Sequence, residues 1–284
     1  MDTAVVSKGV VVNADASQVY RDIPIICAAP DEKGAEHVLY GFRDGAEPLS
    51  AAEWAKLARS AVESAHSHGK TPVLVGGTGL YLRTLIDGIA PVPPIDPAIR
   101  ADVRAASVAD NRRALEGLDP QGAARLGAND TVRIARALEV VRSTGKPLAE
   151  WQQAKEGGIG GAVDLRPIVL TPPRDWLYAR CDARFAAMVD AGAVDEVEAL
   201  LERRLDPDLP VMRAIGVKEI AAYLRGETDR ETMIAAGQQS TRRYAKRQYT
   251  WFAHQPPPDW PRFGEPLDAP GAAARALELI GMQG

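Results

Sequence analysis

The sequence predicts an α/β protein in which a parallel sheet is flanked by helices and carries a helical insertion domain. Two short runs, 9–15 (GVVVNAD) and 71–75 (TPVLV), are mainly apolar, as buried parallel strands are. A helical repeat occupies the segment between them, which gives a strand–helix–strand order. The stretch 97–153 then contains helical patterns and no strand-like run, which indicates the insertion.

The composition is that of a globular protein. Of 284 residues, 46% are hydrophobic and 25% are charged, which excludes a largely disordered chain. The net charge of −4 excludes a basic field over the whole molecule but allows a local basic patch. Cys27 and Cys181 lie far apart without CxxC spacing, so we expect neither a disulfide framework nor a zinc site. No secretory signal and no apolar run of about 20 residues is evident, and we expect a cytoplasmic protein.

The first helix with complete signals begins after Ser50. Ser50 and Glu53 form a capping box, and Gly69 is placed to end the helix. Residues 1–9 (MDTAVVSKG) are typical of the end of an earlier helix that leads into the first strand. The apolar residues of the Ser50 helix recur at helical spacing: Trp54, Leu57, Ala58, Ala61, Val62 and Ala65.

The helical stretch is predicted to form a domain of its own. We assign residues 96–162 to the insertion domain, and 1–95 together with 163–284 to the α/β core domain. Ile134, Leu138 and Val141 are the expected core stripe of one insertion helix.

The core domain is expected to resume with a buried strand at 166–171 (RPIVLT), which follows a glycine-rich linker. Two long helices and a shorter one follow, at 173–204, 229–252 and 218–224.

Candidate chemistry follows the first two strands. Asp15 comes directly after one, and Thr78 lies in the turn GGTGLY (76–81) after the other. Ligands of open α/β sheets bind at the carboxyl ends of the strands, so Asp15 is a candidate catalytic carboxylate and Thr78 a candidate hydroxyl ligand. Taken singly, Asp15 also fits a helix cap, and the glycines also fit a simple tight turn.

A second candidate is the basic and aromatic segment 241–252 (TRRYAKRQYTWF). On a helix, Arg243 aligns with Arg247 and Arg242 aligns with Lys246, which makes a basic ridge beside aromatic rings. Such a ridge suits RNA phosphates and stacked bases, and it equally fits a solvated basic face over core aromatics. Arg133 and Arg136 form a smaller version of the same pattern.

Six segments together resemble the bacterial tRNA dimethylallyltransferases, also called tRNA isopentenyltransferases, and cover nearly the whole chain in that family's order. They are NADASQVYR (13–21), PVLVGGTGLYLRTLIDGIAPVPPIDPAIR (72–100), ANDTVRIARALEVVRSTGKPLAEWQ (128–152), an R-F-M-G-E pattern between 184 and 196, MRAIGVKE (212–219) and TRRYAKRQYTWF (241–252).

The resemblance implies transfer of a dimethylallyl group from its diphosphate to the exocyclic amine of the adenosine adjacent to the tRNA anticodon. It implies Asp15 as general base, Arg213 as a diphosphate ligand, and Thr78 and Arg100 as contacts to substrate tRNA. Further tRNA contacts are implied at Ala16, Ser17 and Gln18, at Val132, Arg133, Ile134, Ala135 and Arg136, and at Arg243, Tyr244, Ala245, Lys246, Arg247 and Gln248. The expected cofactor is Mg²⁺, with no metal ligand identifiable in the chain, and the expected state is a monomer.

The family fold is like that of the P-loop NTPases, yet no GxxxxGK[ST] motif occurs here, so we expect its first strand and P-loop to be absent. Either the start of this sequence lies downstream of the natural one, which we favour, or the chain is a catalytically inactive tRNA-binding remnant. A third hypothesis is a small-molecule kinase of the same superfamily, which the tRNA-like basic segments disfavour.

Overall fold

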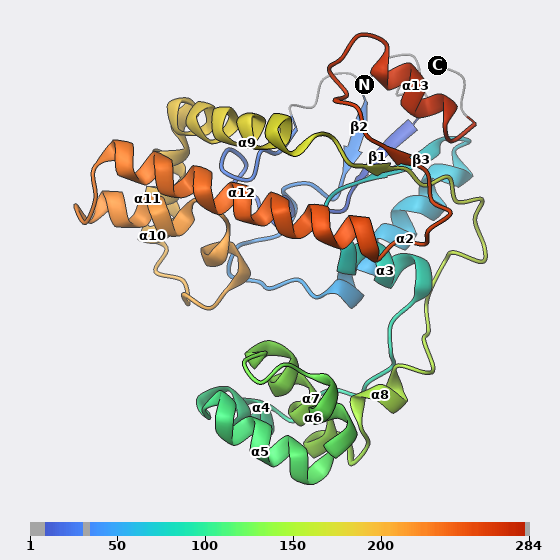
Figure 1. Cartoon of the computed structure of the whole chain (residues 1–284), viewed down its shortest axis with the longest axis vertical. Helices are drawn as coiled ribbons and strands as arrows, with labels where there is room; N and C mark the ends of the chain where they lie inside the picture. The colour runs from blue at the N-terminus through green and yellow to red at the C-terminus, as the bar shows by residue number, and fades with distance from the viewer. Residues whose placement is uncertain (1–8, 31–34, 282–284) are drawn as a thin grey trace. The chain divides into compact units, whose positions relative to one another are not determined.

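The computed structural model describes residues 9–30 and 35–281. Its contacts divide the chain into two units, one made of Met1–Arg83 with Val163–Gly284, the other of Thr84–Ala162 (Figure 1). The helix end predicted for residues 1–9 falls, up to residue 8, outside the described part, and Gly9 already belongs to a strand.

The first unit contains a parallel sheet of three strands in the order β2-β1-β3: β1 (Gly9–Asn13), β2 (Glu36–Val38) and β3 (Thr71–Val75). Every residue of β1 is buried, and its central position places Val12 opposite both Val38 and Leu74. The two strands that the sequence predicts around 9–15 and 71–75 are therefore confirmed. The three-residue β2 carries no comparable apolar run and was not predicted.

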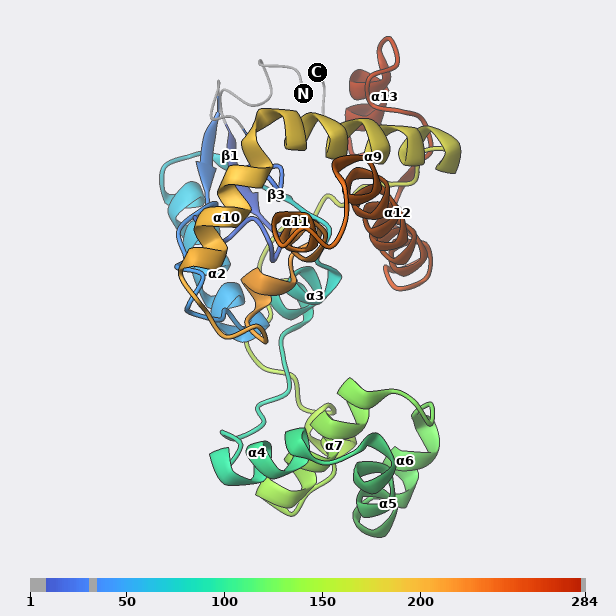
Figure 2. The same ribbon diagram turned by 90° about the vertical axis from the view of Figure 1, so that its left-hand side faces the viewer.

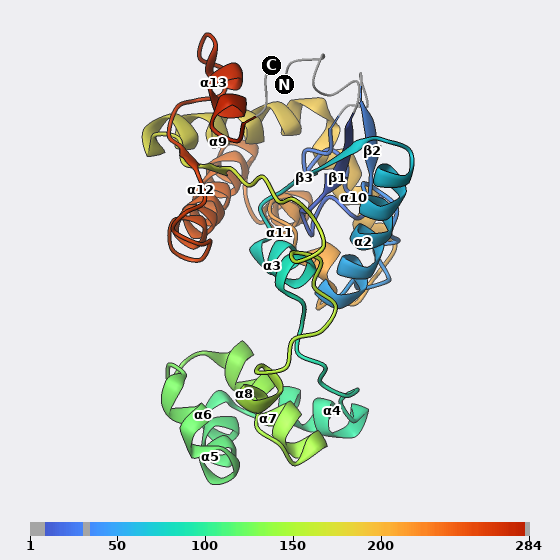
Figure 3. The ribbon, with the colours of Figure 1, turned by 90° about the vertical axis from the view of Figure 1, so that its right-hand side faces the viewer.

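Helix α2 (Ala51–Ser67) packs against β1 and β3, and Figure 3 shows it beside the sheet. The predicted capping box is present, since Ser50 and Glu53 exchange hydrogen bonds at 3.0 and 3.1 Å. The fully buried Trp54 stacks on Tyr81 of helix α3 (Gly79–Asp87) with ring centroids 4.5 Å apart. This stack connects α2 to the helix that follows β3.

The long helix predicted at 173–204 is broken. The structure has α9 (Arg174–Met188), a π-helical turn (Val189–Ala193) and α10 (Val194–Glu202). The break lies at Gly192, whose φ of 103° is outside the helical region and favours glycine.

After a 3₁₀ turn (Pro210–Arg213) come α11 (Val217–Leu224) and α12 (Arg230–His254), as predicted. Helices α9 and α12 pack against each other (Figure 2). A Cβ on Gly237 of α12 would lie 2.0 Å from the ring of Phe185 on α9, so the absence of a side chain there permits the close approach.

The strand predicted at 166–171 is shorter than expected and does not join the main sheet. Only β4 (Val169–Leu170) forms, and it pairs in parallel with β5 (Arg262–Phe263), which leads to α13 (Ala272–Glu278). Pro167 and Pro172 flank the pair, and because proline has no N–H the ladder cannot extend far on either side.

The second unit is a helical domain with α4 (Pro97–Ala105), α5 (Val108–Leu118), α6 (Pro120–Arg125), α7 (Thr131–Thr144) and α8 (Leu148–Trp151). The predicted stripe of Ile134, Leu138 and Val141 lies in its core.

The second unit begins at Thr84, earlier than the boundary expected at residue 96. Backbone bonds explain the difference: Ile89 and Glu156 exchange hydrogen bonds of 2.9 and 3.0 Å, and Ile159 donates to Leu85 at 2.9 Å. The incoming and outgoing segments of the domain are thereby tied together. Among the described residues, no helix combines the length and the apolar character that crossing a membrane requires.

Candidate active site

Two loops are hydrogen-bonded to each other where β1 and β3 end. The N–H of Ala16 donates to the Thr78 hydroxyl at 2.9 Å, and the N–H of Thr78 donates to the carbonyl of Ala14 at 3.1 Å. The Asp15 carboxylate accepts the N–H of Ser17 at 2.8 Å. The sequence prediction that Asp15 and Thr78 lie at one edge of the sheet is therefore confirmed.

Asn13 fixes this arrangement from inside the core. Its buried amide donates to the carbonyls of Asp15 and Leu39 at 3.0 and 2.9 Å, and its Oδ1 accepts the N–H of Asp15 at 2.8 Å. The indole N–H of Trp54 donates to the Asn13 carbonyl at 3.0 Å. Because these buried polar groups are paired, the backbone of Asp15 is held in one position.

The glycines after β3 allow the close approach of neighbouring chain segments. A Cβ on Gly76 would lie 2.2 Å from the carbonyl carbon of Ala14, and one on Gly77 would lie 1.8 Å from the Gln248 amide nitrogen. Gly76 thus lets the two loops meet, and Gly77 makes room for a side chain of α12.

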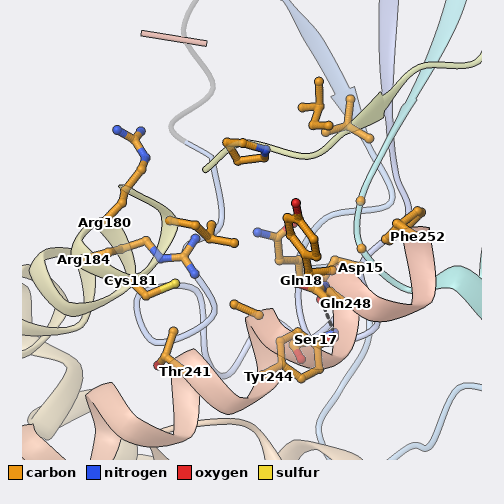
Figure 4. Close-up of a pocket in the computed structure, with 18 of the residues that line it drawn as sticks. Asp15, Ser17, Gln18, Arg180, Cys181, Arg184, Thr241, Tyr244, Gln248 and Phe252 are labelled. Atoms are coloured by element: carbon orange, nitrogen blue, oxygen red, sulfur yellow. Dashed lines mark hydrogen bonds between the residues drawn. The ribbon is translucent and has the colours of Figure 1, made fainter. Parts of the chain in front are cut away.

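A cavity of about 670 Å³ opens beside these loops, entirely within the first unit. Figure 4 shows side chains from the loop after β1, from α9 and from α12 directed into it. Segments of β3 and β4 add an apolar wall. Its lining includes Asp15, Ser17, Gln18, Arg180, Cys181, Arg184, Thr241, Tyr244, Gln248 and Phe252.

Burial raises the pKa of two titratable groups of this cavity. It raises the pKa of Tyr244, and the negative charge of Asp15 acts in the same direction. Burial also raises the pKa of Cys27 to about 12, with Asp15 and Glu196 contributing. Neither group ionises near neutral pH, so the charge in this pocket comes from its carboxylates and arginines.

Arg184 on α9 is the notable cation of the cavity, and the sequence analysis gave it no role. Among the described residues it forms no ion pair, whereas its neighbour Arg180 is bound to Asp268 at 3.2 Å. The only sequence signal was its place at the start of the R-F-M-G-E pattern. Its entry into the pocket depends on how α9 packs.

Arg213, which the resemblance assigned to diphosphate, does not line the cavity. It lies in the 3₁₀ turn before α11, and its guanidinium bonds to the carbonyl and the carboxylate of Asp208. The Arg213 guanidinium is therefore paired at the surface, five residues from Asp208 in the sequence and outside the cavity.

Helix α12 divides its predicted contact residues between two faces. Tyr244, Ala245 and Gln248 line the cavity, whereas Arg243, Lys246 and Arg247 are exposed. Arg242, predicted to align with Lys246 in a basic ridge, instead pairs with Asp182 of α9. We call the three exposed cations Arg243, Lys246 and Arg247 the α12 basic face.

The remaining predicted contacts belong to the helical unit. Arg100 on α4 and Arg133 on α7 are exposed, and the Val132 side chain is 71% exposed. Ile134 and Ala135 are buried in the domain core, so the exposed side chains of this stretch are the ones that RNA can reach. Because α7 is a helix, neighbouring residues of this stretch point in different directions, some to the solvent and some to the domain core.

Glu139 organises a cluster of arginines in this unit. Its side chain is 1% exposed, and it accepts from Arg104 at 2.7 Å and pairs with Arg136 at 3.8 Å. Burial lowers the pKa of Arg136, and the positive charges of Arg100 and Arg104 act in the same direction. Two guanidinium groups therefore share one buried carboxylate with the charge of Arg100 nearby, which leaves excess positive charge. Arg104 was not singled out from the sequence.

The residues described here do not build a metal site by themselves. No group of three His, Cys, Asp or Glu side chains in 9–30 and 35–281 could hold an ion. Of the three carboxylates that line the cavity, Asp268 is bound by Arg180 and Glu265 by Arg275. Only Asp15 remains, which is insufficient for a protein-built magnesium site.

Comparison with known proteins gives consistent matches over most of the chain. The family model described as IPP transferase matches residues 18–255. The tRNA dimethylallyltransferase of Erythrobacter litoralis is 61% identical over 256 residues, which are 89% of this chain and 81% of that protein.

Solved structures agree. The tRNA isopentenylpyrophosphate transferase of Bacillus halodurans has a TM-score of 0.63 and 32% identity, covering 92% of this chain and 84% of that one. A eukaryotic dimethylallyltransferase acting on tRNA has a TM-score of 0.72 and 26% identity, covering 88% and 66%.

Proposed function

This chain belongs to the IPP transferase family and modifies tRNA by prenylation, and from that premise we propose how its cavity performs the reaction. The acceptor we propose is the exocyclic amine of the adenosine adjacent to the anticodon. The donor is dimethylallyl diphosphate. The bond that forms joins the amine nitrogen to the allylic carbon, the bond that breaks joins that carbon to the diphosphate oxygen, and the amine loses one proton.

Asp15 is the proposed general base. The adenine amine is a weak nucleophile because its lone pair is delocalised into the ring, so removing its proton as the new bond forms lowers the barrier. One oxygen of Asp15 accepts the N–H of Ser17, and within 9–30 and 35–281 the other oxygen has no hydrogen-bond partner. That second oxygen is the acceptor for the amine proton.

The adenine must leave its stack to reach Asp15, at a cost of a few kcal/mol. Tyr244 and Phe252 offer aromatic faces in the cavity. The Gln248 amide offers a donor and an acceptor for a base edge, and Gln18 offers its Oε1 as an acceptor, because its amide nitrogen already donates to two carbonyls. We propose that these four side chains hold the flipped base. The fully buried strand β1 holds the start of the loop that carries Asp15 and Gln18 in place.

The diphosphate departs as an anion, and Arg184 is the side chain that we propose to stabilise it. Arg184 lines the cavity, whereas Arg213, which the resemblance assigns to the diphosphate, is paired with Asp208 outside it. Mg²⁺ remains part of the proposal as a companion of the diphosphate, whose oxygens are its natural ligands, because the described residues offer no cage for it.

We propose that two cationic surfaces of the protein bind the phosphate backbone of the tRNA. One is the α12 basic face, and the other is the arginine cluster around Glu139 in the helical unit. Phosphate contacts of this kind supply affinity without reading sequence. We propose that the enzyme is a monomer and that it acts in the cytoplasm.

The observation that carries the proposal is the meeting of Asp15, Arg184 and Gln248 in one cavity (Figure 4). The test is transfer of radiolabelled dimethylallyl from its diphosphate to unmodified tRNA by the 284-residue chain. Label in tRNA that is lost on substitution of the anticodon-adjacent adenosine supports the full proposal.

The alternatives give other outcomes. Retained tRNA binding without label transfer favours the inactive tRNA-binding remnant. Phosphoryl transfer to a nucleoside, without labelled tRNA, favours the kinase hypothesis.

A further inference from the structure

Glu196 makes a long-range side-chain contact to the loop that follows β1. It lies on α10, and its two carboxylate oxygens accept the N–H groups of Ile25 and Ile26 at 2.7 and 2.8 Å. Glu196 is half-buried, and burial raises its pKa while the two N–H donors oppose that shift. Both oxygens of this half-buried carboxylate therefore bind backbone N–H groups of the loop after β1, and this contact requires an explanation.

The contact closes one end of a compact turn at 23–29. Inside it, the N–H groups of Cys27, Ala28 and Ala29 donate to Ile23, Ile25 and Pro24 at 2.9 to 3.1 Å. Such a turn leaves its first N–H groups without internal partners, as a helix N-terminus does. Glu196 supplies both missing acceptors.

The other end of the turn holds Gln18. The Gln18 amide nitrogen donates to the carbonyls of Cys27 and Ala28 at 3.1 and 2.8 Å. Ala28 has a φ of 53°, a left-handed conformation that costs a non-glycine residue energy and persists only where surrounding contacts enforce it. The turn is therefore stressed at its Gln18 end and anchored at its Glu196 end.

We propose that Glu196 is a positioning residue for the base-binding side of the cavity. Through the turn 23–29 it holds the carbonyls that orient the Gln18 amide, although the Glu196 side chain does not itself line the cavity. This inference rests on the proposed function, since it assigns Gln18 to the tRNA substrate. It predicts that substitution of Glu196 weakens the binding of tRNA and leaves the binding of the diphosphate donor unchanged.

The test is a double-mutant cycle with Glu196→Gln and Gln18→Ala. Glutamine keeps the size of Glu196, but its amide nitrogen cannot accept an N–H, so one of the two bonds is lost. We expect E196Q to raise the Kd and the KM for tRNA by about tenfold, the effect of one hydrogen bond to a charged acceptor. The KM for dimethylallyl diphosphate is expected to stay within about twofold, since in the part of the chain that the structure describes Arg184 makes no hydrogen bond to residues 23–29.

In the Gln18→Ala background, E196Q is expected to change tRNA binding less than about twofold, because the link is already cut. Additive effects of the two substitutions, or an equal rise in both KM values, would overturn the inference. Glu198→Gln, an exposed residue of the same helix, is the control and should leave both KM values unchanged.

A second variant and a second measurement keep the test decisive if E196Q fails to fold or the enzyme turns over slowly. If E196Q does not fold, Glu196→Asp retains the charge with a shorter reach and is expected to show a smaller loss confined to tRNA. The double-mutant cycle is measured both as the Kd for tRNA and as the rate of turnover. Wild-type protein that binds tRNA without transferring label contradicts the proposed function, whereas additivity in Kd contradicts the role of Glu196.

Discussion

The Thr78 hydroxyl accepts the backbone N–H of Ala16 at 2.9 Å, and this bond joins the loop after β3 to the loop that carries Asp15. The two residues are 62 positions apart in the sequence. A side chain assigned from the sequence to substrate contact is thus also a structural link of the catalytic loop. The position of Asp15 depends on it.

Thr78→Ala is expected to lower kcat/KM for tRNA by about tenfold or more, because the half-buried N–H of Ala16 loses its acceptor. Thr78→Ser keeps the hydroxyl and should retain most of the activity. Steady-state kinetics with varied tRNA distinguishes the two variants. Equal kinetics for Ala and Ser at this position would contradict the linking role.

Gly76→Ala is expected to reduce the melting temperature more than Gly77→Ala. The added Cβ of Gly76 meets the backbone of Ala14 at 2.2 Å, whereas that of Gly77 meets the flexible end of Gln248. Gly77→Ala should instead weaken tRNA binding by displacing Gln248 from the cavity. Gly117→Ala on α5, with nothing within 4 Å, is the control, and its gain in helix propensity should stabilise by about 0.5–1 kcal/mol.

Acid should remove a stabilising contribution from Asp44. Hydrogen bonds from Arg203 and Arg21 hold the pKa of Asp44 well below its usual value near 3.8. A carboxylate whose pKa is lowered by folding stabilises the folded state above the unfolded pKa, and this contribution is lost as pH falls through the folded value. Urea unfolding at several pH values should show wild-type protein more stable than Asp44→Ala at pH 6, with the difference shrinking below about pH 4. A difference that does not depend on pH would contradict this.

The salt dependence of tRNA binding should report the α12 basic face. Replacing Lys246 or Arg243 by Gln is expected to weaken binding and to reduce the slope of log K against log salt by up to about one per residue. Arg242→Gln should lower stability and leave the slope nearly unchanged, because Arg242 is bound to Asp182. Equal slopes for all variants would exclude this face as an RNA surface.

Local signals predicted the parts of the site that lie close to strand ends. Asp15 and Thr78 follow two apolar runs directly, so their meeting at one sheet edge follows from parallel pairing. The capping box at Ser50 was equally local. The short strand pair β4–β5 was not predictable in this way, because it joins segments far apart and is limited by prolines.

The role of Arg184 could not be predicted from local pattern, because it depends on packing between α9 and α12. The neighbouring Phe185 lies against Gly237, which sets how closely the helices approach. Two further residues of the R-F-M-G-E pattern now have physical roles, since Gly192 breaks the helix and Glu196 anchors the turn 23–29. The pattern marked the positions but not their functions.

The most direct test of the central claim is single-turnover dimethylallyl transfer to bound tRNA by wild-type protein and by Asp15→Asn. Asparagine still accepts the N–H of Ser17 but cannot take a proton from the amine. The account predicts a rate lower by about 10²–10⁴, with tRNA Kd within about threefold. Asp175→Asn, an exposed carboxamide substitution at the start of α9, should transfer like wild type. Transfer by Asp15→Asn at the wild-type rate would contradict the assignment of Asp15 as the general base.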